Sequence, residues 1–319
     1  MPDNRYGKTP RPGQGHFVAP PEEVQVGAID AVDTSEVPSS LWTDAWRAMR
    51  RRPLFWASAA LILFTVLMAV FPGLFVSASP TECHLEDALG EPTAGHIFGF
   101  DRQGCDIYAR AIYGARASVT VGVLATLFVV VVGTIIGSVA GYFGGLLDTI
   151  LSRFTDIFFA VPFVLAAIVI MSLLSDRNAV VVAVVLAVFG WTSIARITRG
   201  AVLSVKNNEF VTAAKALGMG RLAILGKHVL PNASAPIIVY ATVALGTFIV
   251  AEATLSFLGI GLPSSIVSWG GDLERAQDAI RVAPEIMIYP ATALALTVLS
   301  FIMMGDVVRD ALDPKARKR

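Results

Sequence analysis

The chain has 319 residues, of which 55% are hydrophobic and only 16% are charged, and its mean hydropathy is +0.65. A soluble core cannot hide that much apolar surface, so the composition excludes an ordinary soluble protein and predicts a polytopic membrane protein. The formal net charge is zero. This total says little, because in membrane proteins the placement of charge matters more.

The first 40 residues hold prolines, glycines and scattered charges without periodicity. This composition predicts a disordered tail over residues 1–40. The tail has no short apolar core followed by a small-residue cleavage site, so no removable signal peptide is expected.

Residues 41–52 predict a helix that lies on the membrane surface. Four arginines flank a set of apolar residues at helical spacing, which is the pattern of an interfacial helix. The alternative is a helical extension of the first span. The apolar set is Leu41, Trp42, Ala45, Trp46 and Met49, and the arginines are Arg47, Arg50, Arg51 and Arg52.

Six stretches without Asp, Glu, Lys or Arg predict the membrane spans. Each reaches the roughly 18 to 20 residues that a helix needs to cross the hydrocarbon layer. Lipid offers the backbone no hydrogen-bond partner, so the spans should be helices and the fold all-α. The stretches are 53–81, 117–147, 157–175, 178–195, 229–251 and 286–305.

These stretches divide the rest of the chain. Residues 53–116 should form the first transmembrane helix and an external loop, 117–308 a five-helix core, and 309–319 a basic C-terminal tail. Within the second stretch Gly133, Gly137 and Gly141 fall four residues apart, which permits close contact with another helix.

The placement of Lys and Arg predicts the orientation. Basic residues precede the first span and fill the segment between the fourth and fifth, whereas residues 82–116 carry six acidic residues against three arginines. Because cytoplasmic loops are enriched in Lys and Arg, both termini should be cytoplasmic and the first loop external. An even number of spans agrees with this orientation.

The segment "EFVTAAKALGMGRLAILGKHVLPN", residues 209–232, differs from the apolar runs around it. Ala213, Ala214 and Leu217 recur at helical spacing and Phe210 joins the same face, Gly218 should end this helix, and Pro231 should halt a second one. A short helix with small residues can enter a groove on a partner protein closely. The alternative is a solvated basic loop.

This segment resembles the "EAA" loop of permease subunits from bacterial ATP-binding-cassette importers. That family has Glu-Ala-Ala, three residues, Gly, nine residues, an apolar residue, one residue, and Leu-Pro. The spacing is kept by Ala213-Ala214, Gly218 and Leu230-Pro231. Thr212 replaces the family's Glu and His228 its apolar residue, so Glu209, one helical turn earlier, is the expected acidic contact.

Two further stretches resemble the dipeptide, oligopeptide and nickel group of these permeases. "HIFGFDRQGCDIYARAIYGARASVTVG" (96–122) is similar to that group's loop before the second span, and "AEATLSFLGIGLPSSIVSWGGDL" (251–273) to its exit from the fifth span. Phe100 stands where Thr is usual, and Cys105 where Arg is usual. The surface helix and the lone first span resemble the C-type permease, and the resemblance covers residues 41–313.

The resemblance implies the type I importer permease fold in a bacterial inner membrane. It also implies a second homologous permease subunit, one or two cytoplasmic ABC ATPase subunits and an extracytoplasmic substrate-binding protein, with no nucleic acid involved. The expected substrate is a di- or oligopeptide, and the alternatives are nickel or a glutathione-like molecule. The binding protein largely imposes this selectivity.

The resemblance further implies alternating access driven by ATPases that pull on residues 209–231, with ATP and Mg²⁺ bound by those partner subunits. The run "GRLAILGKH" is not a phosphate loop, because Gly220 and Gly226 are one residue too far apart and His228 replaces the Ser or Thr that binds magnesium. No cofactor is therefore expected in this chain.

Two other classes of protein remain to be weighed. A membrane-embedded enzyme should show paired acids, a His-Glu-x-x-His helix or a Gly-x-Ser-x-Gly turn, and the sequence has none of these. We therefore predict no catalytic residue. A secondary transporter or channel should show charges inside its spans, and Glu252 is the one residue that qualifies.

Glu252 has two interpretations. It would face the translocation path and meet a peptide's amino end or a neighbouring arginine, or it would be a partly hydrated structural residue near the outer end of a long fifth helix. The second interpretation is the preferred one.

Cys83 and Cys105 are the two cysteines of the chain, and both fall in the predicted external loop. An even count in an oxidising compartment favours a disulfide. Two free thiols are one alternative. The other is a zinc site with His84 and His96, although adjacent Cys83 and His84 do not easily point at one tetrahedral ion; no metal site is predicted.

Overall fold

The structure is a computed structural model that describes residues 41–312. The disordered tail predicted for residues 1–40, and residues 313–319 of the predicted basic tail, lie outside the described residues. The described part of the chain is helical, with isolated β-bridges confined to the loop before the second long helix.

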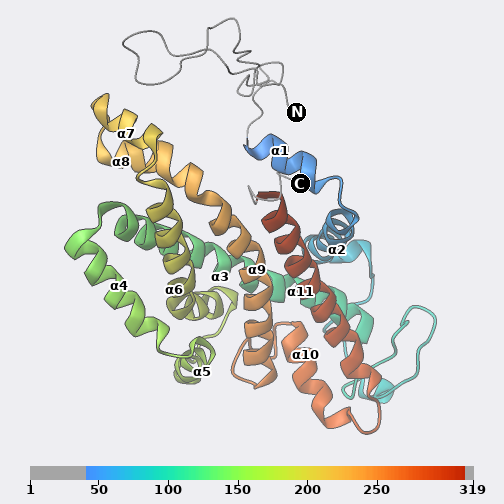
Figure 1. Cartoon of the computed structure of the whole chain (residues 1–319). Coiled ribbons are helices and arrows are strands. Elements are labelled where there is room, and N and C mark those ends of the chain that lie inside the picture. The colour runs from blue at the N-terminus through green and yellow to red at the C-terminus, as the bar shows by residue number, and fades with distance from the viewer. Residues whose placement is uncertain (1–40, 313–319) are drawn as a thin grey trace, which may run out of the picture. The chain divides into compact units, whose positions relative to one another are not determined.

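Most helices follow one another along the chain with short connections, and a long loop over residues 71–106 joins α2 to α3 (Figure 1). They are α1 (Leu41–Met49), α2 (Pro53–Val70), α3 (Ile107–Phe143), α4 (Gly145–Phe159), α5 (Phe163–Leu173), α6 (Ala179–Val205), α7 (Glu209–Ala216), α8 (Arg221–Ile224), α9 (Leu230–Phe257), α10 (Trp269–Ala276) and α11 (Glu285–Leu312). Short 3₁₀ turns lie at Pro72–Leu74, Leu85–Asp87 and Gln277–Ala279, and a π-helical turn at Leu225–Val229 joins α8 to α9.

Among the described residues, five helices are long and apolar enough to cross a membrane, and α4 with α5 adds a sixth if this pair is one span. The five are α2, α3, α6, α9 with the turns before it, and α11. The predicted all-α polytopic class is confirmed.

The third span predicted for 157–175 is not one continuous helix. In its place α4 and α5 meet at a bend of 72°. Pro162 stands directly before α5; it lacks an N–H and disfavours helical conformation in the residue before it, so a continuous helix is broken here.

The other spans have different ends from those predicted from hydropathy. The helix α3 starts at Ile107 because the Asp106 side chain accepts a hydrogen bond from the Ala109 N–H at 2.9 Å. The helix α2 is instead shorter than predicted, because it ends at Val70 rather than at residue 81. The helix α11 continues to Leu312, so the tail expected from residue 309 begins later.

The helix α1 is separate from α2, which shows that it is not a simple extension of the first span. Ala45 is buried against Ala311 and Leu312 of α11. Trp42 and Trp46 stay half-exposed, at 50% and 52%. The helix therefore packs one face on the end of α11 and keeps two indole rings available for the membrane interface.

The helices α3 and α6 pack closely along the glycine row of α3. A Cβ atom on Gly133 would lie 2.0 Å from the Ile194 side chain, and one on Gly137 would lie 2.3 Å from the Ala195 carbonyl oxygen. Gly141 approaches the Arg199 carbonyl in the same way. The close contact that the glycine spacing predicted is present, and α3 forms the centre on which the other helices pack.

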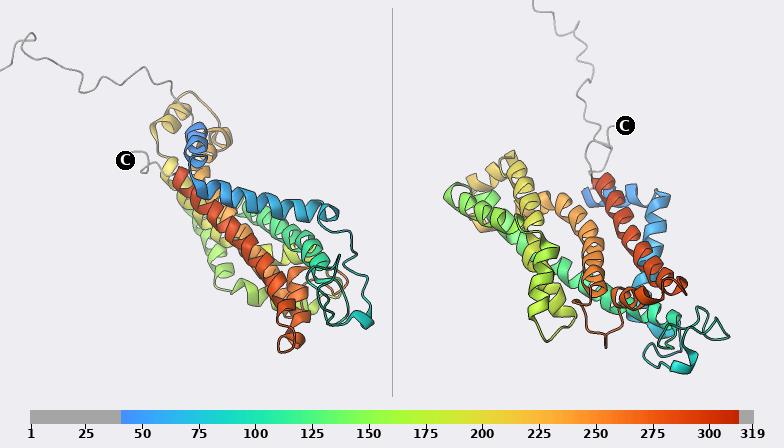
Figure 2. Two further views of the ribbon diagram at one scale, coloured as in Figure 1. Left: turned by 90° about the vertical axis from the view of Figure 1, so that its right-hand side faces the viewer. Right: turned by 90° about the horizontal axis from the view of Figure 1, so that it is seen from below.

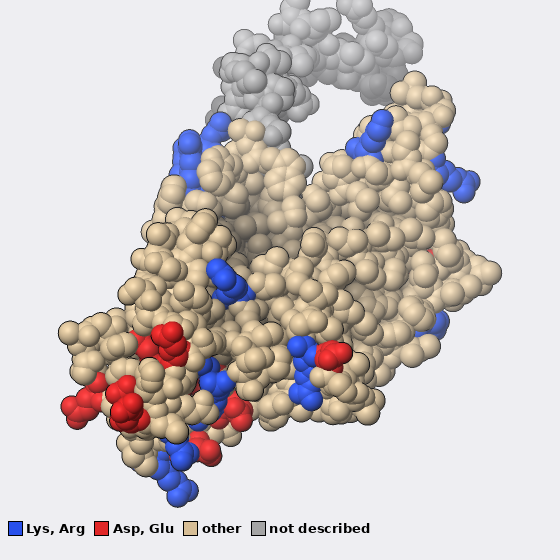
Figure 3. Space-filling view, turned by 180° about the vertical axis from the view of Figure 1, so that it is seen from behind, with Lys and Arg blue, Asp and Glu red and all other residues tan. Residues whose placement is uncertain are grey.

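Surface helices gather at two opposite ends of the helical body. Figures 1 and 2 show α1, α7 and α8 at one end and α10 at the other. Most of the acidic side chains visible in Figure 3 lie at the α10 end, near the loop before α3. Basic side chains occur at both ends.

Candidate functional site

The helix α7 has well-defined ends. Glu209 occupies its first turn, where a negative charge suits the helix dipole. At the other end the Gly218 N–H donates to the Lys215 carbonyl at 3.0 Å, and the Met219 N–H to the Ala214 carbonyl at 3.2 Å. This is a Schellman end, and it needs the left-handed conformation that Gly218 adopts at φ 79°.

The helix α7 has a buried face and an exposed face. Val211 and Ala214 are buried in a cluster with side chains from α6, α8 and the π-helical turn. Ala213 is exposed, and so are Phe210 and Leu217, at 40% and 87%. The prediction that Ala213 and Ala214 share one face with Leu217 is therefore wrong, because the small Ala214 fits against the protein's own cluster.

Leu222 of α8 is 73% exposed and adds an apolar side chain at the same end of the molecule. We call Phe210, Ala213, Leu217 and Leu222 the coupling face. Exposed apolar side chains grouped on short surface helices are typical of a protein–protein contact.

Pro231 does not halt a helix. The π-helical turn at Leu225–Val229 leads directly into α9, so residues 221–257 form one long helix. Pro231 sits exposed in the first turn of α9, where a missing N–H costs little beside the irregular turn. Leu230 is half-buried beside the α7 cluster.

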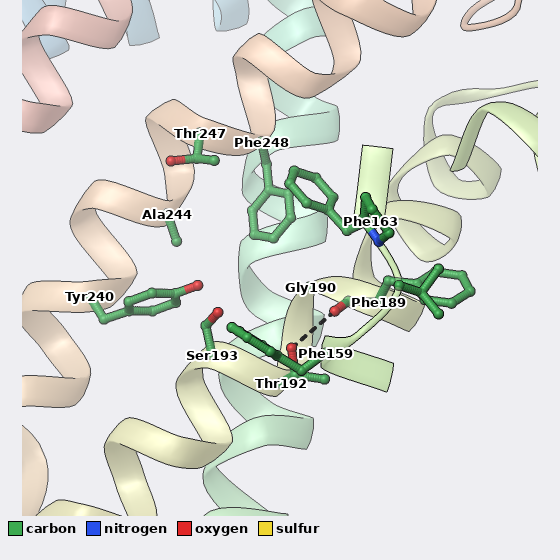
Figure 4. Close-up of a pocket in the computed structure, with 12 residues that line it drawn as sticks. Phe159, Phe163, Phe189, Gly190, Thr192, Ser193, Tyr240, Ala244, Thr247 and Phe248 are labelled. Atoms are coloured by element: carbon green, nitrogen blue, oxygen red, sulfur yellow. Dashed lines mark hydrogen bonds between the residues drawn. The ribbon is translucent and has the colours of Figure 1, made fainter. Parts of the chain in front are cut away.

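A cavity of about 310 Å³ lies between the α4–α5 bend, α6 and α9 (Figure 4). We call it the aromatic cavity, because five of its twelve lining residues are aromatic. Three Ser or Thr residues of α6 and α9 and the Tyr240 hydroxyl add polar groups, and no lining side chain is charged. The lining residues are Phe159, Val161, Pro162, Phe163, Phe189, Gly190, Thr192, Ser193, Tyr240, Ala244, Thr247 and Phe248.

The broken α4–α5 pair forms one wall of this cavity, through Val161 and Pro162. Non-helical backbone at membrane depth is tolerated where it lines a cavity, and transporters place such breaks at substrate sites. Tyr240 and Ser193 direct their hydroxyl groups toward each other across the opening in Figure 4. The site can therefore contact both apolar and polar groups of a neutral molecule.

Glu252 is fully buried, at 0% exposure. Its Oε1 accepts a hydrogen bond from the Ser256 Oγ at 2.8 Å, and that Oγ accepts one from the Leu262 N–H at 3.1 Å. The partly hydrated position that we preferred from sequence is wrong. Glu252 also does not line the aromatic cavity, and its contacts anchor the turn after α9.

Cys83 and Cys105 are joined by a disulfide, and their Cα atoms lie 4.1 Å apart. The His96 Nδ1 pairs with the Asp106 carboxylate. Within residues 41–312 no group of three or more His, Cys, Asp or Glu side chains could hold a metal ion.

Sequence reasoning missed the cavity residues. Phenylalanine, threonine and serine inside an apolar stretch have no distinctive chemical pattern, and helix packing alone brings them together. One usable signal was Pro162, since a proline inside an apolar stretch marks a break.

Comparison with known families places the chain clearly. The profile of the family "Binding-protein-dependent transport system inner membrane component" matches residues 133–318. The profile "N-terminal TM domain of oligopeptide transport permease C" matches residues 40–92.

Curated relatives match nearly the full chain. The oligopeptide transport system permease protein OppC of Bacillus subtilis is 37% identical over 297 residues, covering 93% of this chain and 97% of the relative. The dipeptide transport system permease protein DppC of Alkalihalophilus pseudofirmus is 38% identical over 313 residues, covering 97% and 96%. The glutathione transport system permease protein GsiD of Escherichia coli is 35% identical over 278 residues, covering 86% and 91%.

A solved structure of the MetNI methionine ABC transporter, in an inward-facing conformation, shares the fold. Its matching chain has a TM-score of 0.53 and 20% sequence identity, and the alignment covers 64% of this chain and 96% of that one.

Proposed function

The chain belongs to the family of binding-protein-dependent transport system inner membrane components, and we propose that it is the permease subunit of an ATP-driven importer of di- or oligopeptides. The observation that carries this proposal is the match to peptide permeases over nearly the whole length of both chains. In this proposal the chain forms half of a translocation path and a second homologous permease subunit forms the other half.

The coupling face supports contact with a separate ATPase. It is apolar, exposed and held by the buried cluster beneath α7, so a pull on α7 and α8 acts directly on α9 through the π-helical turn. One or two ABC ATPase subunits would bind here and supply ATP and Mg²⁺ sites. The expected contact set is Glu209, Gly218 and the coupling face. Buried Ala214 supports it from beneath, and Leu230 and exposed Pro231 lie where the segment enters α9.

The charge placement supports a topology with both termini and the coupling face in the cytoplasm. The acidic end with α10 and the disulfide loop would then face outward, where an extracytoplasmic substrate-binding protein delivers its cargo. A bond between Cys83 and Cys105 suits that oxidising side.

The aromatic cavity supports a place on the translocation path. It is uncharged and offers hydroxyl groups among aromatic rings, which suits weak, sequence-tolerant contact with a passing peptide. Glutathione import is the alternative that a relative's name favours, and nickel import is the alternative left from the sequence resemblance.

Uptake by the reconstituted complex tests the proposed substrate. Proteoliposomes with both permeases, the ATPases and the binding protein would receive labelled dipeptide, tetrapeptide, glutathione or Ni²⁺, with ATP on the ATPase side. We expect peptide uptake above that of the other two. Uptake of Ni²⁺ or glutathione without peptide uptake would overturn the proposal.

A further inference from the structure

A second cavity, of about 320 Å³, lies at the α10 end of the molecule. We call it the vestibule. Its walls come from the turn after α5, from the end of α9 and the turn after it, from α10, and from Arg110 of α3. Ligand pockets have volumes of about 300 Å³ and more, so the vestibule is large enough for the end of a peptide.

Three arginines line the vestibule: Arg110, Arg177 and Arg275. Arg110 is buried and already neutralised, because its Nε donates to Asp272 Oδ1 at 2.8 Å and its Nη1 to the Pro80 carbonyl at 3.1 Å. The positive charge of Arg110 is therefore balanced within the protein by Asp272.

Arg177 and Arg275 have no such partner among the described carboxylates. Arg177 donates to the carbonyls of Leu174 and Gly259, both at 3.2 Å. Arg275 donates to the Ser264 carbonyl at 2.7 Å and to the Gln103 amide oxygen at 3.4 Å. Each guanidinium carries five N–H donors, so both hold unused donors in positions fixed by backbone contacts.

The vestibule has an excess of positive charge. Glu274 is the one acidic side chain in its lining and it is exposed, while Asp272 is taken up by Arg110. Burial and the neighbouring Arg110 lower the pKa of Arg275, with Asp272, Asp101 and Glu274 opposing the shift. A carboxylate bound beside Arg275 would therefore stabilise its charged guanidinium.

The helix α9 lines both the vestibule and the aromatic cavity, and α5 runs from the cavity to the turn that lines the vestibule. Phe163 at the start of α5 and Phe248 of α9 line the cavity, and Ser175 after α5 and Ser256 of α9 line the vestibule. Along α9 the two sites are about 12 Å apart, from the rise per residue of an α-helix. An extended peptide spans about 3.3 to 3.6 Å per residue, so about four residues are long enough to reach from one site to the other.

We propose that Arg177 and Arg275 bind the C-terminal carboxylate of a peptide at the outer mouth, before the rest of the peptide enters the aromatic cavity. Planar guanidinium groups match a carboxylate in two parallel hydrogen bonds. This inference rests on the proposed function, because it assumes a peptide cargo delivered from the α10 side. It adds a binding step in the permease to the selection made by the binding protein.

Uptake of a matched peptide pair tests the inference. The pair is one labelled tripeptide with a free C-terminus and the same tripeptide as its C-terminal amide, chosen so that the binding protein binds both. The double variant Arg177→Gln with Arg275→Gln should lower uptake of the free acid about ten-fold and of the amide less than two-fold, as expected for loss of charge-assisted hydrogen bonds.

The matched control is Arg102→Gln, which removes an exposed arginine at the same end that pairs with Asp278 at 3.4 Å. This variant should leave both uptake rates unchanged. The double variant Arg177→Lys with Arg275→Lys keeps the charges and should recover part of the free-acid uptake. Assembly of each complex is measured by the amount of permease retained with the ATPases.

The outcomes separate the two proposals. If the wild-type complex takes up no peptide, the proposed function fails. If wild type takes up peptide and the glutamine variant matches it, or loses both members of the pair equally, the carboxylate site is wrong and the arginines only hold the turns around them.

Discussion

The absence of a side chain on Gly137 determines how closely α3 and α6 pack. An added Cβ would meet the Ala195 carbonyl oxygen at 2.3 Å, and backbone cannot move aside as a flexible side chain can. Gly200 of α6 is the useful contrast, because a Cβ there meets nothing within 4 Å.

Gly137→Ala should therefore destabilise the protein by about 1–3 kcal/mol through overpacking. Gly200→Ala should be neutral or slightly stabilising, since alanine favours a helix over glycine. Thermal unfolding of the purified chain in detergent compares the two variants. Equal midpoints for Gly137→Ala and wild type would show that α3 and α6 are not in the close contact described.

The bond between Cys83 and Cys105 makes a second prediction for single residues. Neither thiol should react with a maleimide in the folded, unreduced protein, and both should react after reduction and unfolding. Replacing both cysteines by serine should cost about 3 kcal/mol of loop stability by the chain-entropy estimate. Full labelling of both cysteines without reductant would mean that no bond forms.

Among the helices, α7 offers the sharpest test because Ala214 is buried while Leu217 is exposed. Ala214→Leu adds bulk inside the cluster with Val211 and should reduce folded yield. Leu217→Asp changes an exposed side chain, so folding should persist while peptide uptake and peptide-stimulated ATP hydrolysis are lost. Normal uptake by the Leu217→Asp complex would exclude this part of α7 from the contact with the ATPase.

Gly218 gives an independent test of the same helix end. Gly218→Ala should cost about 1 kcal/mol because of the left-handed backbone at φ 79°, although a Cβ there meets no atom within 4 Å. The matched control is Gly220→Ala, which is equally open and has an ordinary φ of −65°. Proteolysis within residues 217–221 should speed up for Gly218→Ala alone, and equal rates would contradict the strained end.

Sequence reasoning found the helices better than it found their ends. A charge-free stretch stops where a charged residue appears, whereas a helix stops at a cap or a break. Asp106 therefore starts α3 early, and Pro162 divides a stretch that hydropathy reads as one span. The spacing of Gly133, Gly137 and Gly141 was more informative, because it encodes a close packing distance directly.

The sequence located one functional segment but missed the cavity, because helix packing is not encoded in a local pattern. The motif around Ala213 and Gly218 has fixed spacing and could be located from sequence, but its faces depend on the cluster beneath α7. Glu252 attracted attention as a charge within a span, yet packing buries it beside Ser256 and outside the cavity. The cavity itself arises where four helices, α4, α5, α6 and α9, meet, which no local pattern encodes.

The charge placement predicts the topology of the whole molecule. Tags inserted after Arg319 and within residues 217–221 should be protected in intact cells, and a tag beside Glu91 in the disulfide loop should be accessible from outside. The result is read by labelling with a membrane-impermeant reagent before and after permeabilisation. External labelling of the tag at Arg319 would reject this orientation.

The energy source for uptake tests the central claim most directly, because it separates an ATP-driven importer from a secondary transporter or channel. Peptide uptake is measured in proteoliposomes that hold the complete complex, with ATP supplied on the ATPase side and with ionophores that collapse the proton and sodium gradients. The account predicts uptake that requires ATP and continues at an unchanged rate when the gradients are collapsed. Uptake that is driven by a gradient in the absence of ATP would contradict it.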